Sequence, residues 1–340
     1  MSLILALLGL GIVIFAHELG HFLGARLGGM RVKQFALGFG WRLFGLRRRG
    51  TDYRVNAIPF GGYVMVDGVE DEEAEAERND PRKMQNRPVW ARAVFALSGP
   101  LFNLVLAGVL LSAAVSMQGL PTGRRVEVGT VQAGSPAARA GLRTGDILLT
   151  VNGEEAVSAA TVSGHVGKAV GAVVFRVQRG GEIRRIVAYP HDGRVGMMLQ
   201  ERVLYRRDRL TPVAVAGYTV ETLTRMSLSV AEAFAMLVTG RAGVRDLTGP
   251  VGMVNQAAAT AATGPANLLL LLAFISVNLG LFNLFPIPAL DGGRLVLLAL
   301  EKAGIRLSQT RQAAIQVAGF AVIFILIIVV SVFDVARMVR

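Results

Sequence analysis

Residues 320–330 read Phe-Ala-Val-Ile-Phe-Ile-Leu-Ile-Ile-Val-Val, an unbroken apolar run. It is the centre of a longer apolar stretch over residues 313–335. A helix needs about 20 such residues, at 1.5 Å each, to cross the hydrocarbon core of a bilayer. Three more stretches reach this length, at residues 3–25, 93–117 and 267–290. The sequence therefore predicts a multi-pass α-helical membrane protein with four transmembrane helices.

The composition agrees with this class. Of the 340 residues, 52% are hydrophobic and 18% charged, and the mean hydropathy is +0.49. A soluble domain carries about 25% charged residues, and a disordered chain lacks so much apolar surface. The net charge of +12 would suit nucleic acid, an anionic membrane or membrane topology. Aromatic residues make up only 7%, too few for base-stacking platforms, so no nucleic-acid partner is expected.

Basic residues flank the first apolar stretch on one side only. No Lys or Arg precedes it, whereas residues 28–92 hold 12 of them. Because short cytoplasmic loops are enriched in Lys and Arg, the C-terminal end of this span is expected in the cytoplasm. Because each span carries the chain across the membrane, the long insert at 118–266 is then expected outside the cytoplasm, and the loop at 294–312 inside it.

The spans divide the chain into eight predicted segments. These are a first span, a cytoplasmic loop with a β-hairpin, a second span and an α/β module, at 1–27, 28–92, 93–117 and 118–203. An amphipathic linker, a third span, a cytoplasmic loop and a fourth span follow, at 204–266, 267–293, 294–312 and 313–336. Within the linker, residues 213–238 predict a helix that either lies on the membrane surface or docks on other helices.

The β-hairpin is predicted from the residues around Pro59-Phe60-Gly61-Gly62, which have strand-type neighbours on both sides. The hairpin would cover residues 51–66, with its turn at 59–62. In the insert, short β-branched runs alternate with Gly-rich turns, which predicts a small mixed α/β module.

The chain has no cysteine and only four histidines, so any metal must be held by His, Asp or Glu. Two of the histidines form the motif His17-Glu18-Leu19-Gly20-His21 inside the first apolar stretch. On a helix these histidines lie about 40° apart, so both imidazoles can bind one Zn²⁺. Glu18 can then act as general base on a water bound to that ion. Ionisable groups inside an apolar span are costly to insert, which favours a functional site over a solvated helix end.

A catalytic zinc site has three protein ligands and an open position for water. His165 and His191 lie in the insert, across the membrane from the motif. Asp291 ends the third span, at the depth of His17 and His21, after a proline-interrupted segment. Exposed backbone is tolerated in a membrane only where it lines a cavity. On spacing alone, Asp291 is either the third ligand or a solvated carboxylate at a helix end.

Together these motifs resemble the site-2 proteases, zinc metalloproteases of the peptidase M50 type that cut peptide bonds within the membrane. The resemblance rests on His17-Glu18-x-x-His21, on Asn283-x-x-Pro-x-Pro-x-Leu-Asp291-Gly-Gly and on Ser98-Gly-Pro-Leu-Phe-Asn103. It covers nearly the whole chain and is nearest to the bacterial regulator of sigma-E protease group. It implies Zn²⁺ as cofactor, His17, His21 and Asp291 as its ligands and Glu18 as the catalytic base.

The resemblance also implies substrates and a location. Asn283, Asn103, Gly61 and Gly62 would bind the substrate, the two glycines on a membrane-associated β element that adds the substrate as a strand. Substrates would be single-span membrane proteins, such as an anti-sigma factor or a remnant signal peptide. The protein would lie among the lipids of the bacterial cytoplasmic (inner) membrane, with its zinc site near the cytoplasmic face.

The insert resembles one circularly permuted PDZ domain, on the strength of Gly134-Ser-Pro-Ala-Ala-Arg-Ala-Gly141 and the following Gly145-Asp146. Its binding loop would lie near Gly193-Arg-Val-Gly196-Met and would take a PDZ peptide or a substrate C-terminus. This domain would be extracytoplasmic.

Two other functions are compatible with parts of the sequence. A non-catalytic, PDZ-bearing membrane scaffold would carry a structural zinc site, which four protein ligands normally close. A zinc transporter would need polar residues on several spans, and the second and fourth spans offer almost none.

Overall fold

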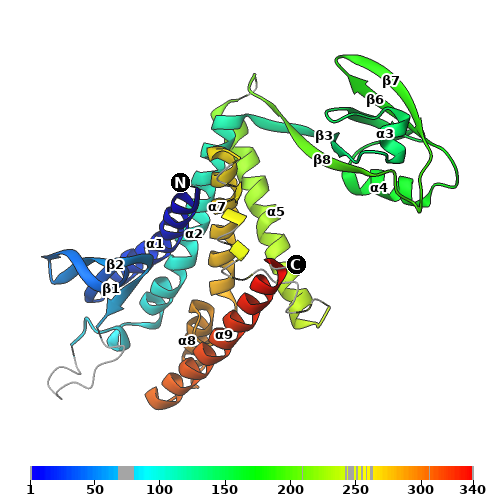
Figure 1. Ribbon diagram of the computed structural model, residues 1–340. Helices are drawn as coiled ribbons and strands as arrows, with labels where there is room; N and C mark the ends of the chain where they lie inside the picture. Colours follow the sequence, from blue (N-terminus) through cyan, green and yellow to red (C-terminus); the bar gives the residue numbers. More distant parts are fainter. Residues whose placement is uncertain are drawn as a thin grey trace. The chain divides into compact units, whose positions relative to one another are not determined.

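The computed structural model describes residues 2–67, 80–208, 210–241, 243, 249, 252–253, 256–257, 259–260, 263–305 and 307–338. The chain divides into two compact units, of which the first joins Met1–Met117 to Pro212–Arg340. The second unit is Gln118–Thr211. Figure 1 shows the first unit as long helices with a small sheet, and the second as a curved sheet with short helices.

In the described part of the chain, four helices are long and apolar enough to cross a membrane. They are α1 (Ser2–Leu27), α2 (Val89–Gln118), α7 (Pro265–Leu284) and α9 (Gln309–Met338). Four helices that could cross a membrane by length and composition thus lie where the sequence predicts the four spans.

Small residues bring three of these helices close together. A Cβ atom added to Gly20 of α1 would lie 2.3 Å from the Ser98 carbonyl oxygen of α2. A Cβ atom added to Gly280 of α7 would lie 2.9 Å from the Pro100 carbonyl oxygen. Backbones that approach this closely are typical of helix packing in membranes. The Ser98-Gly-Pro motif thus lies where α1 and α7 both meet α2.

Helix α5 (Pro212–Val238) packs against the apolar helices. Its Val230 belongs to a buried cluster with residues of α2 and α7, namely Ala107, Leu111, Ala273 and Val277. The hydroxyl groups of Thr219 and Ser112 on α2 also share a hydrogen bond of 3.0 Å. Residues 213–238 were predicted either to lie on the membrane surface or to dock on other helices. In the structure they dock on α2 and α7.

The third predicted span and the loop after it need correction. Helix α7 ends at Leu284, and Asp291 is the first residue of α8 (Asp291–Lys302), which occupies part of the predicted loop. Pro286 and Pro288 have no backbone N–H, and a residue that precedes proline avoids the helical conformation. Phe285 accordingly adopts an extended backbone and ends α7.

Strands β1 (Val32–Arg48) and β2 (Thr51–Val66) form an antiparallel sheet beside α1. Their connecting turn is at Arg49 and Gly50, which have φ angles of 49° and 80°. The hairpin predicted over 51–66 does not form as such, because its two arms do not pair with each other: residues 52–55 and residues 62–65 both pair with residues 34–37 of β1. Residues 52–55 run in the same direction as residues 34–37, and residues 62–65 run in the opposite direction, so the chain does reverse around the predicted turn, where Gly61 has a φ of 78°.

The second unit contains a sheet with the strand order β7-β6-β4-β3-β8, and β5 pairs with β4. Three strands have the bounds β3 (Leu120–Val131), β4 (Ile147–Val151) and β5 (Glu154–Glu155). The others are β6 (Val173–Arg179), β7 (Glu182–Ala188) and β8 (Met197–Arg206). Two helices, α3 (Pro136–Ala140) and α4 (Ala159–Lys168), belong to this unit.

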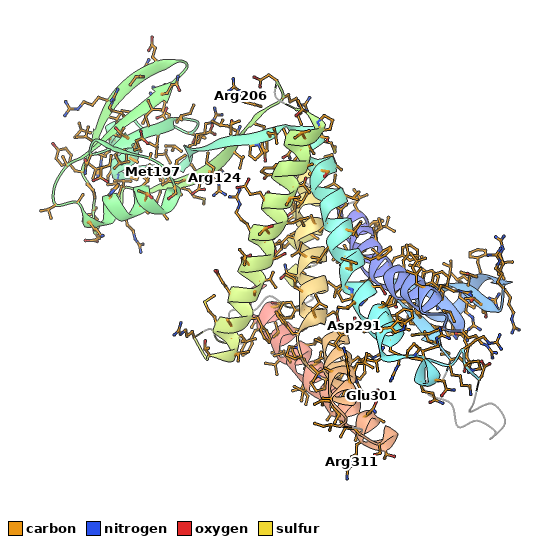
Figure 2. All side chains as sticks on the ribbon, turned by 180° about the vertical axis from the view of Figure 1, so that it is seen from behind. Arg124, Met197, Arg206, Asp291, Glu301 and Arg311 are labelled. Atoms are coloured by element: carbon orange, nitrogen blue, oxygen red, sulfur yellow. The ribbon has the colours of Figure 1, made fainter. Side chains whose placement is uncertain are left out.

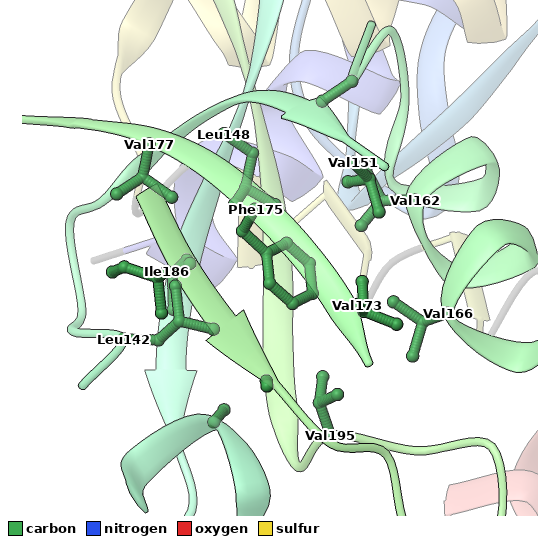
Figure 3. Close-up of a cluster of buried hydrophobic side chains, with 14 of the residues drawn as sticks. Leu142, Leu148, Val151, Val162, Val166, Val173, Phe175, Val177, Ile186 and Val195 are labelled. Atoms are coloured by element: carbon green, nitrogen blue, oxygen red, sulfur yellow. The ribbon is translucent and has the colours of Figure 1, made fainter. Parts of the chain in front are cut away.

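The core of the second unit consists mainly of β-branched residues around Phe175, which is fully buried (Figure 3). Val162 and Val166 of α4 join the strand residues in this cluster. They lie four positions apart on one face of α4, which therefore packs onto the sheet.

A buried ion pair connects the residue before β4 to the end of β6. Asp146 is 1% exposed, and its carboxylate accepts hydrogen bonds of 2.6 Å from Arg179 Nε and Nη2. The Arg143 N–H donates to the same carboxylate at 2.9 Å. Burial alone would raise the pKa of Asp146, but these hydrogen bonds outweigh burial and hold the pKa below its ordinary value. The carboxylate therefore stabilises the fold in its ionised form.

We expect Asp146→Asn to destabilise the second unit by about 3 kcal/mol at neutral pH, because Arg179 would lose its buried counter-charge. The stabilisation is complete above the ordinary carboxyl pKa of about 4 and is lost as pH falls through the lowered folded value. The variant should therefore differ most from the parent near pH 7. Hydrogen–deuterium exchange of β4 and β6 in the full chain measures this, with exposed Asp192→Asn as the control. Equal protection of the Asp146 variant and the control would contradict the prediction.

Candidate metal centre

The motif His17-Glu18-Leu19-Gly20-His21 lies in the C-terminal half of α1. Helical spacing places both imidazoles on one face, and both residues are buried. Aromatic contacts fix α1 against the sheet: the ring centroids of Phe22 and Phe35 are 5.0 Å apart, and those of Phe15 and Phe35 are 5.6 Å apart. The motif is therefore held between α2 on one side and the β1–β2 sheet on another.

Asp291 lies at the start of α8, where the main chain resumes a helix after the proline segment (Figure 2). Near the other end of this helix, Glu301 accepts two hydrogen bonds from the Arg92 guanidinium of α2, at 2.7 and 2.8 Å. This bidentate pair attaches α8 to the helix that also packs against α1. The carboxylate of Asp291 is thereby brought to the two histidines.

Three donor atoms from these residues converge. His17 Nε2 and His21 Nε2 are 3.1 Å apart, and Asp291 Oδ2 lies 3.3 Å from the first and 3.2 Å from the second. In a tetrahedral zinc site, ligand atoms at 2.0–2.1 Å from the metal are about 3.3 Å from each other. Two imidazole nitrogens and one carboxylate oxygen are also a donor set that zinc accepts. The cluster therefore fits Zn²⁺ in both spacing and chemistry.

The other ring nitrogen of His21 has a fixed partner. His21 Nδ1 lies 2.9 Å from the Phe95 carbonyl oxygen, which only accepts hydrogen bonds. The proton of a neutral His21 is therefore on Nδ1, and the lone pair of Nε2 is free to bind a metal. Such an outer partner is a regular feature of metal-binding histidines.

Asn103 plays the corresponding part for His17. Its side-chain amide lies 3.2 Å from His17 Nδ1, and Asn103 Oδ1 is buried without a hydrogen-bond partner. If the amide is rotated by 180°, the oxygen accepts from His17 Nδ1–H, which again leaves Nε2 for a metal. Asn103 is fully buried. The structure thus places it behind His17, which differs from the substrate contact expected of it.

Glu18 lies beside the cluster and is half-buried. A Cβ atom added to Gly62 of β2 would be 3.3 Å from Glu18 Cγ. The absence of a side chain at Gly62 thus leaves room next to this carboxylate. Arg294 of α8 is among the charged groups that act on Glu18.

The remaining predicted site residues lie outside the cluster. Asn283 Nδ2 donates to the Leu279 carbonyl oxygen of its own helix α7, at 2.9 Å. Gly61 lies in β2, where an added Cβ atom would be 2.4 Å from the Phe39 ring. Nothing in these contacts assigns either residue to a substrate.

Two parts of α2 that contact His21 were not predicted from the sequence. They are the Phe95 carbonyl and Gly99. A Cβ atom added to Gly99 would lie 2.4 Å from His21 Nε2. Only the Ser98-Gly-Pro-Leu-Phe-Asn103 motif signals that this part of α2 is special. The contacts themselves join residues more than 70 positions apart, which no local pattern reveals.

Comparison with known proteins places this site in a family. The family model described as peptidase family M50 matches residues 5–326. A Clostridium acetobutylicum protein, whose name provisionally describes it as a zinc metalloprotease, is 33% identical over 340 residues, with 98% of this chain and 97% of the relative covered. The metalloprotease MmpA of Caulobacter vibrioides is 31% identical over 357 residues, covering 92% of this chain and 88% of the relative.

A Brucella suis protein, also named provisionally as a zinc metalloprotease, is 35% identical over 317 residues, with 86% of this chain and 83% of the relative covered. The four apolar helices and these matches define a membrane peptidase. The chain belongs to peptidase family M50.

We expect Gly99→Ala to lower zinc affinity by tenfold or more, because the new methyl group would displace the His21 ring; loss of an outer partner alone costs about 10–100-fold. Gly108→Ala, on the same helix, is the matched control: its Cβ would meet Leu223 at 3.5 Å, an ordinary contact. Competition with a chelator measures both. The same affinity in both variants would show that Gly99 is not needed at the metal centre.

Proposed function

We propose that this chain is an intramembrane zinc metalloprotease, which hydrolyses peptide bonds within the transmembrane segments of single-span membrane proteins. One observation carries the proposal: His17, His21 and Asp291 converge beside Glu18 within a unit of membrane-length helices. The names of the M50 relatives support Zn²⁺ as the metal.

His17, His21 and Asp291 would hold the ion through Nε2, Nε2 and a carboxylate oxygen. When bound, Zn²⁺ lowers the pKa of a coordinated water toward about 7 and polarises the scissile carbonyl. The chain's own residues supply the rest. Phe95 and Asn103 orient the imidazoles, and Glu18 accepts a proton from the attacking water and returns it to the leaving amine.

The structure supports a substrate position along β2. Gly62 lies next to Glu18, and Leu37 of β1 pairs with it from one side. A substrate segment added to this sheet as a further strand would be extended, as a peptide bond must be for cleavage. Asn283, half-buried on α7, is the proposed further contact of the substrate backbone.

Exposed apolar side chains of β1 support membrane association of this sheet. Trp41 is 85% exposed and Phe44 73% exposed, with Leu43 and Leu46 next to them. Such a patch on a soluble surface would be unfavourable, whereas in a bilayer it contacts lipid. By the basic residues after α1, we place this sheet and the metal centre near the cytoplasmic face of a bacterial inner membrane.

We further propose that the second unit is one extracytoplasmic PDZ domain, as in the regulator of sigma-E protease group. Strand β8 lies at the edge of its sheet and contacts α4. The loop before β8 contains Gly193 and Gly196, with φ angles of 70° and 74°. An exposed edge, a helix beside it and a glycine loop at its start are the parts with which a PDZ domain binds a C-terminus.

The rival function, a scaffold with a structural zinc site, requires a fourth protein ligand. Among the described residues, the cluster offers three, which leaves a position for water and favours catalysis. Substrates of the anti-sigma-factor or remnant-signal-peptide type remain part of our proposal and come from the likeness to site-2 proteases.

Removal of the metal tests the proposed function. We expect the purified chain in lipid vesicles to cleave a single-span reporter and to lose this activity in a strong chelator. Added Zn²⁺ should restore cleavage, whereas Mg²⁺, which prefers oxygen ligands in an octahedral geometry, should not. Gel analysis of the reporter checks each step. Undiminished cleavage by zinc-free protein would refute the metalloprotease assignment.

A further inference from the structure

The segment between α7 and α8, residues 285–290, determines where Asp291 lies. We propose that Gln316 of α9 is a positioning residue for this segment: its amide oxygen fixes the turn at Pro288 and Ala289, and thereby the Asp291 carboxylate. The inference rests on the proposed function, because it assumes that Asp291 binds the metal.

The first observation is an unfavourable backbone conformation. Ala289 has a φ of 77°, in the left-handed region that residues with a Cβ atom seldom occupy. Its N–H donates a hydrogen bond of 2.9 Å to Gln316 Oε1. Ala289 is half-buried, and a backbone N–H withdrawn from water without an acceptor is costly, so this side chain stabilises a turn that is otherwise disfavoured.

The second observation is the close approach of α9 at this point. A Cβ atom added to Gly319 would lie 2.5 Å from the Pro288 carbonyl carbon and oxygen. Gly319 and Gln316 are three positions apart and share one face of α9. Most other side chains of α9 are exposed, among them Val317, Phe320 and Val322. The contact with residues 288–289 is thus a specific attachment of an otherwise sparsely packed helix.

The third observation is that residues 285–290 are also tightly packed against the start of α8. Cβ atoms added to Gly292 and Gly293 would lie 2.2 Å from the Phe285 carbonyl oxygen and 2.3 Å from the Ile287 carbonyl oxygen. The Leu290 N–H also donates to Ile287 at 3.1 Å. Because the segment is tightly packed, a change of backbone conformation at Ala289 should also move Asp291, which is only two residues further along.

Two variants separate the hydrogen bond from mere packing. Gln316→Leu removes the acceptor at nearly constant size, and Gln316→Glu keeps an oxygen acceptor. Gln312→Leu is the matched control, because Gln312 lies one turn earlier on α9 and its amide donates to the Leu307 carbonyl oxygen, away from residues 285–291.

Zinc affinity, measured by competition with a chelator in the full chain, is the primary readout. We expect Gln316→Leu to lose about 10–100-fold, as for other residues that orient a metal ligand. Gln316→Glu and Gln312→Leu should bind zinc like the parent. In cleavage assays Gln316→Leu should lower kcat and leave KM unchanged, because the substrate sites are intact.

Thermal unfolding followed by circular dichroism shows whether each variant is folded. A folded Gln316→Leu chain with the affinity of the parent would overturn the inference, as would equal losses in Gln316→Glu and Gln316→Leu. Asp291→Asn is measured in parallel. If that variant also keeps zinc, the proposed function fails. If it loses zinc while Gln316→Leu does not, only the role of Gln316 fails.

Discussion

Glu18→Gln should abolish proteolysis, with a fall in kcat of about 10²–10⁴-fold, while the chain still binds zinc. A glutamine amide cannot accept the proton that the attacking water must lose, and general-base catalysis contributes rate factors of this size. Glu18 itself is absent from the cluster of donor atoms formed by His17, His21 and Asp291. The metal centre should therefore survive the substitution.

Cleavage of a single-span reporter in vesicles gives the rate, and elemental analysis gives zinc per chain. Glu221→Gln is a suitable control, since Glu221 is an exposed residue of α5 that pairs with Arg225. A Glu18→Gln chain that cleaves at the parental rate would rule out Glu18 as the base. Loss of zinc together with activity would instead assign Glu18 to metal binding.

The second large effect is expected for Asp291→Asn, which should lose most bound zinc and with it all cleavage. The carboxylate oxygen lies within 3.3 Å of both imidazole nitrogens, and the neutral amide is a far weaker ligand for a cation. Zinc affinity should fall by more than the roughly 10–100-fold that follows loss of an outer partner. Equilibrium dialysis against a zinc buffer measures the change.

Asp334→Asn provides a matched comparison, because Asp334 is another buried aspartate of the same unit. Its carboxylate accepts hydrogen bonds from the Gly249 and Gly252 N–H groups and is not part of the metal cluster. Zinc binding by this variant should equal that of the parent. If both variants lose zinc to the same extent, the effect reflects general instability and Asp291 is not a specific ligand.

The features predicted correctly from the sequence are those with a local signature. Apolar runs of membrane length indicated the four spans, since their hydrophobicity is a property of each segment alone. The His17-Glu18-x-x-His21 spacing placed two imidazoles on one helical face by geometry. Asp291 could be named as a candidate because both it and the motif lie at the ends of apolar spans.

Other features depend on tertiary packing and left no local signature. Pro59-Phe60-Gly61-Gly62 does reverse the chain, yet the segments on either side of it pair with residues 34–37 of β1 and not with each other. The partner of a buried polar residue cannot be read from its own neighbourhood. Asn103 reaches His17 from 86 residues away, so its place behind a histidine emerged only from the structure.

The central claim is that this site hydrolyses peptide bonds inside the membrane. Mass-spectrometric mapping of the products from a single-span reporter, cleaved by the zinc-loaded chain in vesicles, tests it most directly. Our account predicts new termini within the apolar span of the reporter, and no such termini with the Glu18→Gln chain. Cuts confined to the soluble flanks, or the same intramembrane termini with Glu18→Gln, would contradict it.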